Sequence, residues 1–104
     1  MPTDQYHEPA NELSAETRTL VRMLTSLQEE AEAINWYQQR ISIEADEDAK
    51  AIMKNAQQEE FKHFGMDLEF LLRKMPVWQA TLKEILFKEG DIVELGEKGE
   101  DAAE

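Results

Sequence analysis

Apolar residues recur with helical spacing along two long stretches of this chain, and this periodicity constrains the fold more than any other feature. In the first stretch, residues alternately four and three apart form one seam: Met23, Leu27, Glu30, Ile34, Tyr37 and Ile41. In the second stretch, a face with the same periodicity contains Ile52, Met53, Ala56 and Phe64. No segment alternates apolar and polar residues as a strand does. We therefore predict an all-α chain with two long antiparallel helices packed through these faces, plus a short C-terminal helix.

Local start and stop signals divide the chain. Ser14 is a favourable N-cap residue, the acidic segment around Asp46 favours a second helix start, and Pro76 ends the second helix while opening a third. The predicted parts are a polar lead-in over 1–13, helices over about 14–42, 46–74 and 76–89 within a helical domain over 14–90, and an acidic tail over 91–104. We expect this tail to be mobile.

Composition excludes several classes of protein. The chain has 104 residues, a formal net charge of −12 and no cysteine. The negative charge argues against nucleic acid and anionic membrane surfaces as partners. The absence of cysteine excludes disulfides, thiolate zinc sites and cysteine catalysis. We find no apolar run long enough to span a membrane.

Three polar residues interrupt the apolar faces. Glu30 lies in the seam of the first helix, while Glu60 and His63, three residues apart, share a face of the second. A Glu on one helix and a Glu-x-x-His on another form half of a carboxylate-bridged di-iron site. The chain has no second Glu-x-x-His, since its other histidine, His7, lies in the Pro-containing lead-in. Two copies related by a two-fold axis would supply all six ligands and complete a four-helix bundle.

Ligand chemistry alone leaves alternatives open. Carboxylate and imidazole suit iron and other first-row divalent ions. With iron, the ligands could form a redox centre. With zinc or calcium at the same ligands, they would give a metal-stabilised structural or adaptor assembly without redox activity. A metal-free helical adaptor is the third hypothesis. Spacing alone makes Asp67, four residues after His63, a candidate partner for the second ring nitrogen of that histidine.

The segments EEAEAINWYQQR (29–40) and EEFKH (59–63) resemble the encapsulated ferritins, short ferritin-like proteins housed in encapsulin nanocompartments. The resemblance covers about residues 7–95. It implies a ferritin-like four-helix bundle rebuilt by homodimerisation, and dimers assembled into a ring that is typically decameric. It also implies ferroxidase activity, with Fe(II) oxidised to Fe(III) at the dimer interface by oxygen and stored inside the encapsulin shell in the cytoplasm.

The resemblance also implies roles for individual residues. Glu30, Glu60 and His63 match the ferroxidase ligands, and Tyr37 matches a tyrosine beside the centre. Glu29 and Glu32 match acidic residues of a metal-uptake site, where calcium or zinc are further candidate ions. The apolar C-terminal targeting peptide usual in the family is not evident in residues 91–104.

Overall fold

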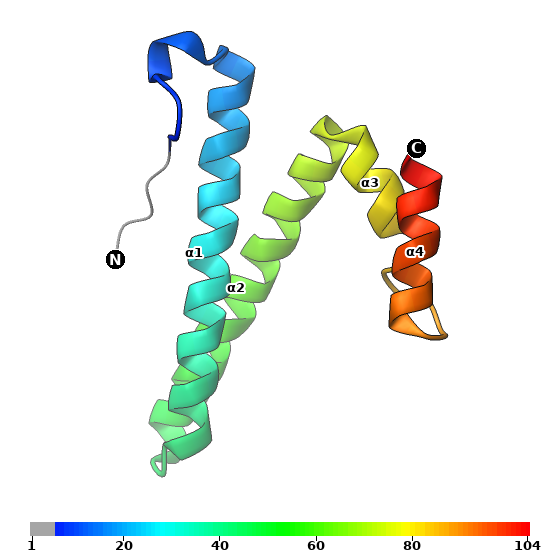
Figure 1. The fold of residues 1–104 in the computed structure, drawn as a ribbon. Coiled ribbons are helices and arrows are strands. Elements are labelled where there is room, and N and C mark those ends of the chain that lie inside the picture. The colour runs from blue at the N-terminus through cyan, green and yellow to red at the C-terminus, as the bar shows by residue number, and fades with distance from the viewer. Residues whose placement is uncertain (1–5) are drawn as a thin grey trace. The chain divides into compact units, whose positions relative to one another are not determined.

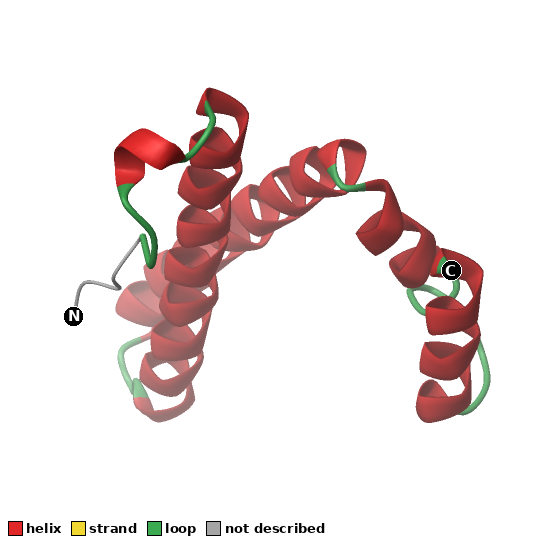
Figure 2. Cartoon of the chain, turned by 45° about the horizontal axis from the view of Figure 1, so that its top comes forward, coloured by secondary structure: helices red, strands yellow, loops and turns green. Residues whose placement is uncertain are grey.

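The computed structural model describes residues 6–104, so residues 1–5 of the predicted lead-in lie outside the described part. Helices and short connections make up the described chain, with no strand (Figures 1 and 2). The prediction of an all-α chain is confirmed. The chain forms two compact units, a first that ends at Glu69 and a second over Phe70–Glu104. None of the described helices has the length and apolar character needed to cross a bilayer.

Local capping explains where the two long helices begin and end. A short 3-10 helix, η1 (Ala10–Glu12), precedes α1 (Ala15–Ile43), and the Ser14 hydroxyl accepts a hydrogen bond of 3.0 Å from the Thr17 N–H. Helix α2 (Glu47–Lys74) begins where the Asp46 carboxylate accepts from the Ala49 N–H at 2.8 Å. It ends before Pro76, which lacks the N–H that a continuing helix needs.

Helices α1 and α2 form an antiparallel hairpin within the first unit (Figure 1). Of the predicted seam, Ile41 is buried, while its other members are half-buried. Several large apolar side chains of this hairpin stay exposed: Trp36, Ile43, Ile52, Phe61 and Met66. One protomer therefore leaves much of its apolar surface uncovered.

The second unit combines the end of α2, where Leu71 and Leu72 are buried, with α3 (Pro76–Lys83) and α4 (Ile92–Ala103). Helices α3 and α4 pack closely because Gly99 has no side chain: a Cβ there would overlap the carbonyl oxygen of Thr81 and lie 3.3 Å from its Cγ2. Gly99 is accordingly buried.

Two predicted boundaries differ from the structure. The third helix, expected over 76–89, ends at Lys83, because the next hydrogen bonds tighten to three-residue turns and Phe87 adopts a left-handed φ of 61°. The tail expected to be mobile over 91–104 contains α4. This helix begins because the Asp91 carboxylate accepts from the Glu94 N–H at 3.0 Å, and it packs against α3.

We expect Gly99→Ala to destabilise the protein by about 1–3 kcal/mol, because the added methyl group forces α4 away from α3. Gly96→Ala, in the same helix, is the matched control, since a Cβ there meets nothing within 4 Å. This control should stabilise the protein by about 0.5–1 kcal/mol through helix propensity. Thermal unfolding followed by circular dichroism measures both changes. Equal melting temperatures for the two variants would contradict the close packing of α3 on α4.

Candidate metal centre

Three side chains from two helices converge on one point of the hairpin. Glu30 extends from α1, and Glu60 and His63 extend from successive turns of α2. Each offers one ligand atom, and these atoms all lie within 4.8 Å of one another. Within the described residues, this is the one group of three or more acidic or histidine side chains close enough to hold a metal ion.

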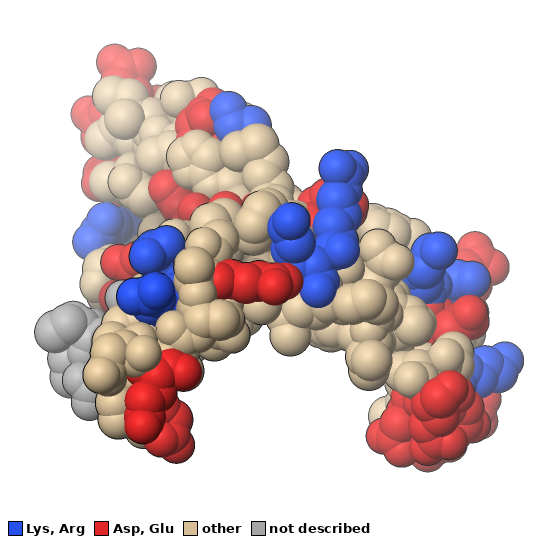
Figure 3. Space-filling view, turned by 90° about the horizontal axis from the view of Figure 1, so that it is seen from above, with Lys and Arg blue, Asp and Glu red and all other residues tan. Residues whose placement is uncertain are grey.

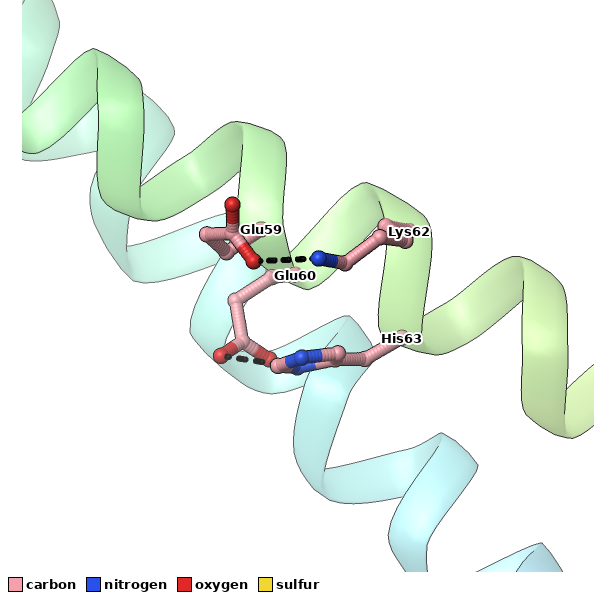
Figure 4. Close-up of polar contacts among 4 residues, drawn as sticks. All are labelled: Glu59, Glu60, Lys62 and His63. Carbon is pink, nitrogen blue, oxygen red and sulfur yellow. Dashed lines mark ion pairs between the residues drawn. The ribbon is translucent and has the colours of Figure 1, made fainter.

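The separations in this cluster suit a divalent cation. Oε1 of Glu60 and Nδ1 of His63 lie 3.8 Å apart, which is too long for a hydrogen bond. Two ligands at about 2.1 Å from one ion lie about 3–4 Å apart, depending on the bond angle. A small rotation of the side chains therefore brings all three donors onto one ion. Figure 4 shows Glu60 and His63 on one side of α2, with the 2.7 Å Glu59–Lys62 ion pair beside them.

Gln57 sets the register that brings the two helices' ligands together. Its side chain is 8% exposed and donates two hydrogen bonds from Nε2, to the Ile34 carbonyl at 3.2 Å and to Oε1 of Gln38 at 3.0 Å. Gln57 lies one turn before Glu60, and Ile34 lies one turn after Glu30. The pair of bonds therefore holds α2 against α1 directly beside the cluster. The sequence analysis did not identify Gln57, because a single Gln carries no motif.

The surroundings of Glu30 strongly raise the pKa of its carboxyl group. The pKa of Glu30 is raised from its ordinary value of 4.5 to about 7, most of all by burial and then by the neighbouring Asp67 carboxyl, through a hydrogen bond and its negative charge. The charges of Glu60 and Glu29 act in the same direction. A carboxyl in this environment takes up a proton near neutral pH unless a cation neutralises it.

Asp67 lies beside the Glu30 carboxyl across the hairpin. Spacing alone made Asp67 a candidate partner of the His63 imidazole, and that contact stays a prediction. Oε2 of Glu30 and Oδ2 of Asp67 are both buried, and no N–H or O–H group donates to either. Spacing on one helix could not reveal this pairing, because it depends on how α1 and α2 meet.

The other predicted site residues have surroundings of their own. The Tyr37 ring lies under the guanidinium of Arg40, 5.5 Å from ring centroid to Cζ. Glu29 and Glu32 are exposed on α1, and His7 is exposed in the lead-in. The structure thus brings together Glu30, Glu60 and His63, and neither Glu29 nor Glu32 belongs to this group of ligand atoms.

Figure 3 shows Asp and Glu side chains in several groups over the face in view, with Lys and Arg side chains beside some of them. The three donors of the candidate centre are recognised by their mutual distances.

Comparison with known proteins finds one matching family model and two similar proteins. The family model described as EncFtn-like matches residues 5–89. A "Ferritin-like protein" of Thermotoga maritima is 44% identical over 95 residues, which cover 91% of this chain and 83% of that protein. An "Encapsulated ferritin-like protein" of Rhodospirillum rubrum is 40% identical over 86 residues; these cover 83% of this chain but 61% of that protein.

A solved structure is also similar. The crystal structure of protein ne0167 from Nitrosomonas europaea superposes with a TM-score of 0.82 at 42% sequence identity. The superposition covers 86% of this chain and 98% of that one. Over the superposed part of the chain, the helical fold is therefore shared with an experimentally determined relative.

The raised pKa of Glu30 predicts how the stability of the metal-free protein depends on pH. Because the folded state holds a proton on Glu30 that the unfolded state has released, stability falls as the pH rises from about 4.5 to about 7. Glu30→Gln should remove this loss, of the order of 1–3 kcal/mol after allowance for solvent screening. Urea denaturation in the presence of a chelator, at pH 5 and at pH 8, measures the free energy of unfolding whose difference gives this loss.

Glu16→Gln, an exposed change in the first turn of α1, is the control and should keep the wild-type pH dependence. The same pH dependence in Glu30→Gln as in the wild type would contradict the environment assigned to Glu30.

Proposed function

Because this chain belongs to the EncFtn-like family, we propose that it is a ferroxidase that oxidises Fe(II) to Fe(III) at a di-iron centre formed between two copies. The observation that carries the proposal is the convergence of Glu30, Glu60 and His63, whose ligand atoms lie within 4.8 Å of one another. Carboxylate and imidazole ligands suit iron. The substrate is the Fe(II) ion itself, and dioxygen is the electron acceptor.

The protomer supplies half of the ligands that such a centre needs. A ferritin-like di-iron site takes a Glu from each of two helices and a Glu-x-x-His from each of two others. A two-fold axis beside the cluster would provide two copies each of Glu30, Glu60 and His63. The exposed Trp36 and Phe61 side chains support such an interface, because they are apolar surface that a second copy can cover.

Charge and electron balance follow from this composition. Two Glu30 and two Glu60 carboxylates carry four negative charges, which two Fe(II) ions neutralise. Oxidation of both ions releases two electrons, which reduce one dioxygen to hydrogen peroxide with the uptake of two protons.

Storage and location are proposed from the relatives. The Rhodospirillum rubrum protein is named as encapsulated, which supports a place for this chain inside a cytoplasmic encapsulin nanocompartment. We propose that dimers assemble further into a ring, typically decameric, with the encapsulin shell protein as partner. Glu29 and Glu32, exposed one residue before and two residues after Glu30, are proposed to collect Fe(II), and Tyr37 to act beside the centre.

Removing a proposed ligand should reduce Fe(II) oxidation. Glu30→Ala, Glu60→Ala and His63→Ala each remove two ligands per dimer, so each should slow the reaction by about tenfold or more. Anaerobic Fe(II) loading followed by air exposure measures it through Fe(III) absorbance and oxygen consumption. Glu29→Ala and Glu32→Ala should slow uptake more than the oxidation of iron already bound.

Glu16→Ala is the control for loss of an acidic residue from α1. Full activity in any of the three ligand variants would remove that residue from the centre. Zinc or calcium binding with no oxygen consumption on Fe(II) addition would instead favour a metal-stabilised structural assembly.

Assembly should depend on metal. Without metal, four carboxylates meet at a closed interface and repel one another. An ion that binds the dimer but not the separate protomer favours assembly, by about 2.7 kcal/mol per site at a free concentration 100 times the dissociation constant. Chelated protein should therefore run as a monomer or small oligomer in size-exclusion chromatography with light scattering, and Fe(II) should convert it to the ring.

Glu60→Ala separates assembly from catalysis. With part of the repulsion removed, this variant should assemble without metal yet oxidise little Fe(II). Identical oligomers with and without Fe(II), in dilute wild-type protein, would show that metal and assembly are independent.

A further inference from the structure

Asp67 has an environment unlike that of any other acidic residue in the described chain. It lies on α2 one turn after His63 and is 9% exposed, whereas every other described Asp or Glu is half-buried or exposed. Its Oδ2 atom is buried and receives no hydrogen bond from an N–H or O–H group. A buried carboxylate without a donor or a cation is costly, typically by several kcal/mol.

The neighbour of this carboxylate is a second one in the same condition. The Asp67 carboxyl lies close enough to that of Glu30 to raise its pKa, and Oε2 of Glu30 is likewise buried and without a hydrogen-bond partner. A divalent cation between the two carboxylates would neutralise both charges.

We propose that a hard divalent cation binds between Glu30 and Asp67, so that Glu30 is shared by this position and by the cluster with Glu60 and His63. The inference rests on the proposed function in taking Glu30 as a ligand of the iron centre. The Asp67 position offers only carboxylate oxygens and selects Fe(II)-like or Mn(II)-like ions over zinc, whereas the cluster adds an imidazole. It gives an Fe(II) ion a second binding position beside the centre.

Mn(II) is a suitable probe, because it prefers oxygen ligands and its free form is counted by electron paramagnetic resonance. We expect Asp67→Asn to bind about one Mn(II) fewer per protomer than the wild type. Zinc affinity, measured by calorimetry and dominated by Glu60 and His63, should change little. Asp48→Asn, an exposed change in the first turn of α2, is the matched control and should bind as many Mn(II) ions as the wild type.

Equal Mn(II) stoichiometry and affinity in Asp67→Asn and the wild type would overturn the inference. Equal losses of Mn(II) and zinc affinity would also overturn it, because Asp67 would then support the whole cluster rather than bind its own ion. Circular dichroism checks the fold of the variant, and Asp67→Ser replaces it if Asp67→Asn fails to fold.

Fe(II) oxidation by the wild type distinguishes this inference from the proposed function. An Asp67-dependent Mn(II) ion in a wild-type protein that does not oxidise Fe(II) would leave the inference standing and refute the ferroxidase. A wild type that oxidises Fe(II) but binds no Asp67-dependent Mn(II) ion would refute the inference and leave the ferroxidase standing.

Discussion

The register between α1 and α2 is the constraint on which the candidate centre depends. Gln57 donates to the Ile34 carbonyl and to the Gln38 side chain one turn from the ligands. A slip of one helical turn moves side chains by about 5.4 Å. This exceeds the 4.8 Å within which the ligand atoms of Glu30, Glu60 and His63 now lie. A neutral, buried amide thus determines where the charged groups meet, and it does so without adding charge to a cluster that is already acidic.

The carboxylates of this hairpin work against its own stability. Burial and the neighbouring acids together raise the pKa of Glu30 to about 7. A chain selected only for a stable metal-free fold gains more from apolar residues at Glu30 and Asp67, since unpartnered buried carboxyls are unfavourable. The same arrangement becomes favourable once cations replace the missing hydrogen-bond donors. This is the physical reason for interpreting the cluster as a metal centre rather than as a polar defect in the packing.

Sequence periodicity predicted the helices and the helix faces on which the ligands lie, because both follow from spacing along one helix. Glu30 stands in an apolar seam, and Glu60 and His63 share a face, so packing the two faces brings them together. The contact between Glu30 and Asp67 could not be predicted, because it depends on the offset between helices. The early end of α3 depends on three-residue turns and on Phe87 at φ 61°. Helix α4 had a local signal, Asp91 followed by Glu94, but its packing needs the contact of Gly99 with Thr81.

Solvent exposure connects the proposed metal centre to the proposed dimer. The His63 side chain is 42% exposed and that of Glu60 25% exposed in the single chain. Water around these ligands weakens their interaction with an ion, because electrostatic attraction falls as the effective dielectric rises. A second copy that covers Phe61 and the neighbouring apolar surface would exclude this water while adding its own ligands. Burial of apolar area, which favours association, would then also strengthen the binding of the ions that neutralise the interface. Under the proposed function, dimer formation and metal binding are two parts of one equilibrium.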